Sequence, residues 1–277
     1  MDLQITKSDG VHTLSQFGLW VQDVMDSTPS IEHNFRRVWG KSARVNAGAT
    51  YAEKMITAVG KAIVADVRTF EDLKDTVNGL VVDIEPFYVH KMLPDDDGLY
   101  DYENPGETTG ELNFIDVPHT LHKYRWKVVS SGQVDWRFIG KYQTGMLYEF
   151  TMDFITVEIP FGETVPVTLP VGTSIQYKGN TPNSQLESPW AVQLTATAGQ
   201  PGTFSLKIGE QTYTHTTSTP VDAGDVFVIT GISTHLNDTN VTHRTNYGHF
   251  VLKPGCNAVT TTFVGDIAIL DYKELYK

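Results

Sequence analysis

The sequence has a single cysteine, Cys256, among 277 residues. One cysteine excludes an intrachain disulfide and predicts a protein made and folded in a reducing cytoplasm. A lone thiol beside Pro254 and Gly255 is more often a small buried hydrophobe than a nucleophile, so we expect Cys256 to be buried in a turn. No apolar run approaches the ~20 residues of a membrane span, and residues 1–4 carry neither basic nor apolar signal features. We therefore expect no membrane association and no export signal.

Positive charge is also scarce. The chain has 21 Lys and Arg against 33 Asp and Glu, a net charge of −12. Most of this excess lies in residues 1–163, which have 15 basic and 25 acidic residues, whereas residues 164–277 have 6 and 8. Phosphate contacts need Lys and Arg, so this balance argues against a protein that grips nucleic acid.

Motifs that carry catalysis or bind metal are missing too. There is no G-x-S-x-G and no glycine-rich phosphate loop. The run Asp95-Asp96-Asp97-Gly98 has its glycine too early for an EF-hand loop and predicts a solvated hairpin loop. His119 and His122 lie in a β-rich context, where alternation separates them onto opposite faces. The remaining candidates for a Ser/His/Asp arrangement are scattered: His215, His235, Asp238, His243 and His249. We predict no enzyme, no catalytic residues, no cofactor and no metal.

What the chain does contain changes character at residues 159–162, Ile-Pro-Phe-Gly. The part before this junction predicts strands and one helix over residues 69–78, capped by Thr69 and ended by Gly79. Phe70, Leu73 and Val77 share one face of that helix. Residues 80–84 predict a strand, and the strand-like stretch 54–68 is broken by Gly60. Residues 29–50 give no clear signal.

The part after the junction predicts only short strands separated by Gly, Asn, Pro and Asp turns, including one over residues 241–244. Such spacing is typical of an antiparallel sandwich. The sequence thus predicts a mainly β protein with two domains, residues 1–163 and 164–277. Aromatics such as Trp190, Tyr177 and Tyr247 could stack a sugar ring on the second domain, or they could fill its core.

Several marks occur together in a fixed order along nearly the whole chain. They are the helix at 69–78, the Glu85-Pro86-Phe87 strand, the junction at 159–162, the run Ile175-Gln176-Tyr177-Lys178-Gly179-Asn180, and the segment 250–259 with its Pro254-Gly255-Cys256-Asn257 turn. In this order they resemble the distal tail proteins (Dit) of siphophages that infect Gram-positive bacteria. The Gly179-Asn180 and Pro254–Asn257 turns fit that fold because glycine supplies positive φ and asparagine tolerates it.

The resemblance implies an N-terminal β-sandwich with one helix and a belt-like hairpin, and a C-terminal galectin-like antiparallel sandwich. It further implies a homohexameric ring at the tail tip of the virion, formed by the first domain and assembled in the host cytoplasm. The ring would join the tail tube protein to the tail-associated tip protein, carry receptor-binding proteins, and let DNA pass without specific binding. An acidic first domain would then give a net-negative channel.

A carbohydrate-binding module for the host surface is the alternative hypothesis, with Trp190 and Tyr247 as its candidate contacts. The galectin patterns H-x-N-x-R and W-x-x-E-x-R are not matched around His243-Arg244 or Trp190. The sequence does not name the host, the ring contacts, or which partner the second domain binds.

Overall fold

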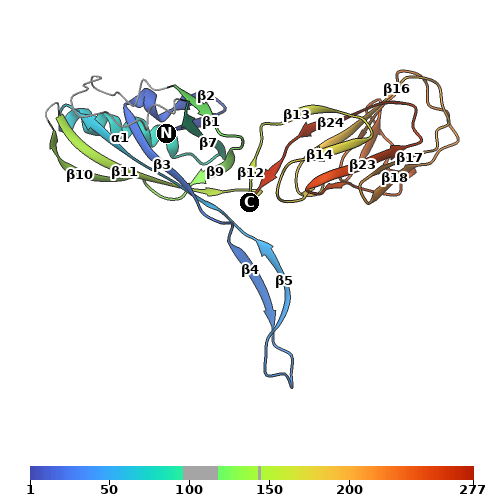
Figure 1. The fold of residues 1–277 in the computed structure, drawn as a ribbon, viewed down its shortest axis with the longest axis horizontal. Coiled ribbons are helices and arrows are strands. Elements are labelled where there is room, and N and C mark those ends of the chain that lie inside the picture. The colour runs from blue at the N-terminus through green and yellow to red at the C-terminus, as the bar shows by residue number, and fades with distance from the viewer. Residues whose placement is uncertain (96–117, 143–144) are drawn as a thin grey trace, which may run out of the picture. The chain divides into compact units, whose positions relative to one another are not determined.

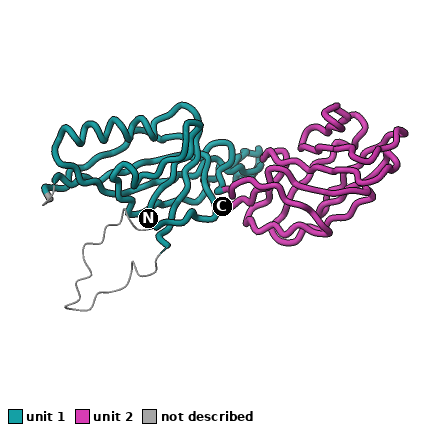
Figure 2. The backbone as a smooth tube through the Cα atoms, turned by 90° about the horizontal axis from the view of Figure 1, so that it is seen from above, with its two compact units in different colours: residues 1–162 teal, residues 163–277 magenta. Residues whose placement is uncertain are grey.

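A computed structural model of the chain describes residues 1–95, 118–142 and 145–277 (Figure 1). Contacts between Cα atoms divide the chain into two compact units, residues 1–162 and 163–277 (Figure 2). Antiparallel sheets make up both units, and the described residues contain one α-helix. The mainly β prediction is therefore confirmed.

Unit 1 is built on a nine-stranded antiparallel sheet. Its main path runs, in spatial order, through β2 (Gly10–Thr13), β1 (Asp2–Lys7), β7 (Phe87–Pro94), β9 (Trp126–Ser130), β11 (Gly145–Thr156), β6 (Met55–Val64) and β3 (Leu19–Asp26). β10 (Asp135–Tyr142) pairs with β11, and β8 (His119–Leu121) pairs with β7. A short 3₁₀ helix, η1 (Leu14–Phe17), leads from β2 to β3.

Two neighbouring strands of this sheet, β6 and β11, pair over ten residues. Side chains of β6, and those of β11 from Tyr148 onward, alternate between buried and at least half-exposed. The buried face carries Phe150, Met152 and Phe154, which belong to the main core of the unit. The predicted break at Gly60 is wrong, because β6 runs straight through it. Its missing side chain leaves room for the Phe150 ring: a Cβ there would lie 2.5 Å from Phe150 Cζ and 2.2 Å from the Trp20 carbonyl oxygen.

The helix α1 (Val67–Val81) is longer at both ends than the sequence predicts. Asp66, rather than Thr69, caps it, with the Asp66 Oδ1 accepting a hydrogen bond from the Thr69 amide at 2.9 Å. Gly79 lies inside the helix, so the predicted termination there and the predicted strand over 80–84 are both wrong. Phe70 attaches α1 to the sheet: its ring stacks on Tyr148 at 3.8 Å between centroids.

Unit 2 is built on a six-stranded and a four-stranded antiparallel sheet. The six-stranded sheet has, in spatial order, β13 (Val167–Val171), β24 (Gly265–Tyr272), β16 (Ala191–Ala196), β19 (Val226–Ile229), β20 (Thr234–Leu236) and β21 (Thr239–Asn240). The four-stranded sheet has β14 (Ser174–Tyr177), β23 (Gly255–Thr261), β17 (Phe204–Ile208) and β18 (Gln211–His215). Two short pairs complete the strands: β12 (Gly162–Glu163) with β25 (Leu275–Tyr276), and β15 (Asn183–Ser184) with β22 (Val251–Leu252). Side chains from both large sheets share one buried core.

Three local expectations for unit 2 have mixed outcomes. Residues 242–244 form a 3₁₀ helix, η3 (Thr242–Arg244), so the predicted strand at 241–244 is wrong. Gly255 has positive φ as predicted, +97°, and the Asn257 side chain accepts from the Lys253 amide at 3.0 Å, but the bend is at Pro254, because Gly255–Thr261 is strand β23. Gly179 does not have positive φ. It is needed because a Cβ would lie 2.5 Å from the Tyr177 hydroxyl.

Candidate interaction surface

Residue patterns did not locate a long hairpin in unit 1, formed by β4 (Ile31–Arg36) and β5 (Val45–Tyr51). Only the family resemblance implies a belt-like hairpin in this part of the chain. We call residues 31–51 the arm. It extends away from the nine-stranded sheet, and its strands pair only with each other (Figure 1). Every residue of both strands and of the connecting segment 37–44 is exposed. An isolated two-stranded hairpin is at best marginally stable in water, so a partner that covered the arm would stabilise it.

The arm is bent by a β-bulge in the middle. The pairing register shifts between His33 and Phe35, so that Ala47 and Gly48 together oppose one residue of β4. Gly48 has φ +138°, a conformation that other residues rarely adopt. The amide of Gly48 donates to the Asn46 side chain at 3.0 Å, which fixes the bulge locally.

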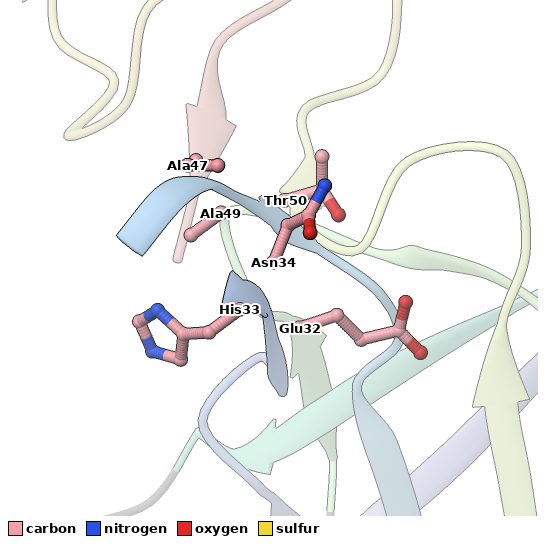
Figure 3. Close-up of a pocket in the computed structure, with 7 residues that line it drawn as sticks. Glu32, His33, Asn34, Ala47, Ala49 and Thr50 are labelled. Atoms are coloured by element: carbon pink, nitrogen blue, oxygen red, sulfur yellow. The ribbon is translucent and has the colours of Figure 1, made fainter. Parts of the chain in front are cut away.

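The bulge hollows one side of the arm into an open concavity of about 590 Å³ (Figure 3). Small side chains from β5 form its floor, and Glu32 and His33 point to opposite sides in the close-up view. The His33 ring stacks on Phe35 with centroids 5.5 Å apart. The arm therefore offers one aromatic edge and a shallow surface of small residues, to which another protein backbone could approach closely.

Charge distinguishes the arm from the rest of the chain. It carries four basic residues, Arg36, Arg37, Lys41 and Arg44, and one acid, Glu32, which gives it a net charge of +3. Since the whole chain carries −12, the other residues together carry −15. Trp39, between these cations at the end of the arm, is fully exposed. A cationic, aromatic tip of this kind fits an anionic partner with some exposed apolar area.

The root of the arm, in contrast, is firmly attached to unit 1. The buried Lys54 ammonium lies 2.6 Å from the Asp26 carboxylate, which joins the segment after the arm to the end of β3. The segments that precede and follow the arm are also joined by hydrogen bonds between Ser30 and Glu53. Thr156 pairs with the backbone of Lys54 from the end of β11. These contacts fix the two ends of the arm to each other and to unit 1.

The two predicted carbohydrate contacts lie in very different environments. Trp190 is in the core of unit 2 with 2% of its surface exposed, so its ring faces are not available for stacking on a sugar. Tyr177, with the same exposure, is also a core residue. Tyr247 is 70% exposed and lines a cavity of about 230 Å³ together with Thr230, Thr242 and Thr245.

The histidine and cysteine candidates lie on several different elements of the described chain. His119 lies in β8, while the carbonyl of His122 contacts the His90 ring at 2.5 Å. His215 is fully buried, and most of the Asp95–Gly98 run lies outside the described residues. Cys256 is exposed in β23, so the prediction of a buried thiol in a turn is wrong. Among the described residues there is no group of three potential metal ligands.

Neither the described helix nor the 3₁₀ segments are long and apolar enough to cross a membrane. No family model matches the chain, and no curated protein matches it either. The solved structures do give a match. The crystal structure of SPP1 Dit (gp 19.1), described as a paradigm of the hub adsorption apparatus in phages infecting Gram-positive bacteria, covers 98% of this chain and 98% of its own, with a TM-score of 0.65 and 10% sequence identity.

The fold is that of the SPP1 Dit protein. This confirms, at the level of the fold, the resemblance to Dit proteins that the ordered sequence marks indicate. The phage P2 baseplate in its activated conformation with Ca also aligns, over 100% of this chain and 98% of its own, with 8% identity. Its TM-score of 0.41 is too low to support an argument about shared structure.

Proposed function

We propose that this chain is a structural hub of a phage tail tip or baseplate. Likeness to the SPP1 Dit hub protein over 98% of both chains carries this proposal, and both units take part in the likeness. In this role six copies form a ring through unit 1, which joins the tail tube protein to the tail-associated tip protein. DNA passes through the ring without specific binding, and unit 2, as a galectin-like domain, presents receptor-binding proteins.

Assembly into a closed ring suits a chain whose most exposed element is an arm. Contacts of one surface with a different surface on the next copy produce rings when the rotation closes. The virion tail tip is then the site of action, and assembly takes place in the host cytoplasm. The role calls for no reaction, cofactor or metal.

Mass photometry of the purified chain at rising concentration, followed by negative-stain imaging, tests the hub function. We expect six subunits around a central channel. A chain that stays monomeric at high concentration, both by itself and with the tail tube and tip proteins of the same phage, would overturn the proposal.

A carbohydrate-binding module of the host surface is the second candidate function, and the exposed Tyr247 beside a threonine-lined cavity is the observation that favours it. An aromatic ring with neighbouring hydroxyl groups can stack on and hydrogen-bond to a sugar. Binding of the full chain to purified cell walls, lost in Tyr247→Ala and kept in His243→Ala on the adjacent η3, would favour this function. Equal cell-wall binding by the two variants would exclude the carbohydrate-binding function.

A further inference from the structure

Unit 2 has a second cavity next to the one that Tyr247 lines. This larger cavity has a volume of about 550 Å³ and is lined by residues 185–191, by the turn 230–233 and by Asp271. The smaller cavity, of about 230 Å³, has the same turn as one of its walls. The two cavities therefore adjoin along the turn 230–233, and together we call them the unit 2 groove. The larger half falls in the range of ~300–1,000 Å³ that is typical of ligand pockets.

The wall between the two cavities is held in place by the chain itself. The Thr230 amide donates to the Ser233 carbonyl at 2.8 Å, and the Ser233 amide donates to the Thr230 hydroxyl at 2.9 Å. A Cβ on Gly231 would lie 2.5 Å from the Gln185 carbonyl oxygen, so this turn packs closely on the wall of the larger cavity. A preformed groove binds its ligand at a lower entropic cost than one that must first be ordered.

Apolar and aromatic side chains are exposed along the groove. Ile232 on the shared turn is 84% exposed, Leu186 is 55% exposed and Tyr247 is 70% exposed. Tyr247 also has φ +55°, a conformation that is unusual for a bulky residue and that occurs most often at functional sites. The groove therefore offers an aromatic ring and two aliphatic side chains to the apolar faces of a ligand.

The charged groups of the groove are all acidic. Glu187 and Asp271 line the larger cavity, and the lining of both cavities includes no lysine, arginine or histidine in unit 2, which the structure describes throughout. The Ser188 hydroxyl and the Trp190 indole N–H belong to residues of the same wall, and both are buried without a hydrogen-bond partner. These groups suit a ligand rich in hydroxyls, whereas the two carboxylates repel phosphate and carboxylate groups.

We propose that the unit 2 groove binds a short oligosaccharide without acidic groups, with one ring on Tyr247 and the next ring on Ile232 in the larger cavity. The inference rests on the carbohydrate-binding candidate function and deepens it, since that function calls only on Tyr247 and the smaller cavity. Hydroxyl groups of the second ring donate to the Asp271 carboxylate. Sugars and wall polymers that carry phosphate or carboxylate groups are disfavoured by charge.

An extended peptide is the competing occupant, and the backbone of the groove disfavours it. Addition of a peptide strand needs a row of free amide and carbonyl groups. In the shared turn, the amides of Thr230, Ile232 and Ser233 already donate to groups of the same turn. A sugar needs no such row, because side-chain hydroxyls and carboxylates are sufficient partners for its hydroxyl groups. A protein partner is treated as an outcome of the test.

The test titrates the full chain with three trisaccharides that differ in charge. Cellotriose is neutral, a glucosamine trimer is cationic, and a galacturonic acid trimer is anionic. Isothermal titration calorimetry measures each affinity, and circular dichroism checks that each variant is folded. We expect the wild type to bind cellotriose and the glucosamine trimer but not the galacturonic acid trimer. Added salt should weaken binding of the glucosamine trimer only, because salt screens charge–charge contacts at an exposed site.

Two variants change the larger cavity and leave Tyr247 in place. Ile232→Ala removes apolar contact area and should weaken cellotriose binding by ~3–5-fold. Asp271→Asn, in which asparagine tolerates the φ of +54°, should weaken binding of the glucosamine trimer by ~2–5-fold and allow the galacturonic acid trimer to bind. The matched controls lie outside the groove: Val264→Ala changes another exposed aliphatic residue, and Asp238→Asn changes another exposed acid with positive φ. Both controls should bind like the wild type.

The outcomes separate this inference from the carbohydrate-binding function. If Tyr247→Ala loses binding to cell walls and to cellotriose while Ile232→Ala and Asp271→Asn keep every wild-type affinity, the larger cavity is not part of the site and the function stands. Binding of the galacturonic acid trimer by the wild type, or binding of cell walls without any of the three trisaccharides, would overturn the proposed ligand class. A wild type that binds neither cell walls nor trisaccharides would overturn both proposals. If that protein also loses its contact with the tail-tip protein in Ile232→Ala, the groove is a protein contact instead.

Discussion

The ammonium of Lys54 lies 2.6 Å from the carboxylate of Asp26, and the pair joins the two ends of the arm at its root. The Lys54 side chain is almost wholly buried, whereas that of Asp26 is 32% exposed. The ammonium also lies 5.8 Å from the centre of the Trp126 ring. The arm is therefore anchored by a cation in the core that has a carboxylate and an aromatic face as partners.

The Lys54→Met substitution should destabilise unit 1 by about 1–3 kcal/mol. Breaking a fully buried pair costs ~3–5 kcal/mol, and the partial exposure of Asp26 reduces that cost because water can solvate the remaining carboxylate. Urea unfolding followed by tryptophan fluorescence measures the change, since four of the five tryptophans lie in residues 1–162. Lys74→Met, which removes the exposed pair with Glu71, is the control and should cost less than about 0.5 kcal/mol. Equal losses in both variants would contradict the anchoring role.

Replacing Gly179 by alanine should disturb the core of unit 2. The new Cβ would meet the Tyr177 hydroxyl at 2.5 Å and the Leu275 carbonyl oxygen at 2.7 Å, and that hydroxyl accepts a hydrogen bond from the Leu275 amide. Overpacking together with loss of a buried hydrogen bond predicts a cost of about 2–4 kcal/mol.

The matched variant is Gly172→Ala, where no atom lies within 4 Å of the added Cβ and φ is not positive. This substitution should change stability by less than about 0.5 kcal/mol. Thermal unfolding of the two variants against the wild type measures the difference. A Gly179→Ala protein as stable as Gly172→Ala would show that the 178–181 turn shifts freely, contrary to the packing described above.

Stability of unit 2 should depend on pH through His215. Burial lowers the pKa of this imidazole, which packs between Phe204 and Phe227 while its Nδ1 lies 2.7 Å from the Gly202 carbonyl oxygen. A folded-state pKa below the unfolded value of about 6.5 means that the unfolded chain binds the proton more tightly. Stability is therefore complete above about pH 6.5 and is lost as the pH falls from there toward the folded-state pKa, with a slope of up to ~1.4 kcal/mol per pH unit.

Hydrogen–deuterium exchange of peptides from residues 163–277 between about pH 5 and 8, the range in which histidine titrates, measures this slope after correction for the intrinsic exchange rate. His215→Asn keeps a donor near the Gly202 carbonyl but does not titrate, so it should be less stable throughout with a shallower slope. His243→Asn, which changes an exposed histidine, should keep the wild-type slope. A wild-type slope in the His215→Asn protein would show that another group causes the pH dependence of stability.

Sequence patterns were sufficient where local and tertiary preferences agree. The alternation of Phe150, Met152 and Phe154 predicts β11, because one face of this strand is buried in unit 1. The pair Asp9-Gly10 is typical of a hairpin turn, and β1 pairs with β2 directly beside it. The helix was located correctly but its ends were not, since Asp66 provides a better cap than Thr69.

The arm could not be predicted in this way, because a hairpin exposed on both faces has no reason to alternate between apolar and polar residues. Its sequence contains Gly40, Asn46 and Gly48, and each of these residue types is common in turns. Gly48 instead lies at a bulge within strand β5. The sequence did contain one clue to the arm. Residues 1–163 have 15 basic residues, and four of them lie within the nine residues 36–44. Trp190 illustrates the opposite failure: sequence gives no sign of whether an aromatic in a sandwich faces the core or the solvent.

The charge of the channel is the last prediction, and it depends on the ring. The half-exposed face of the β10–β11–β6 part of the sheet carries three carboxylates, Asp135, Glu149 and Asp153, and two cations, Arg137 and Lys61. Glu149 lies opposite Lys61 and 4.0 Å from Arg137, so its charge is largely offset, whereas the other two carboxylates form no ion pair within the described part of the chain. Outside the arm, residues 1–163 have 24 acids against 11 Lys and Arg, so the surfaces of this part of the chain are mostly acidic.

We therefore expect a net-negative channel lining, which opposes adhesion of DNA during its passage. A cryo-electron microscopy structure of the ring allows the charged side chains within one Debye length of the channel wall, roughly 8–10 Å, to be counted. Acids drawn from residues 1–163 should outnumber Lys and Arg there. A neutral lining, or one dominated by Lys and Arg, would mean that the acidic excess serves solubility on the outer surface instead.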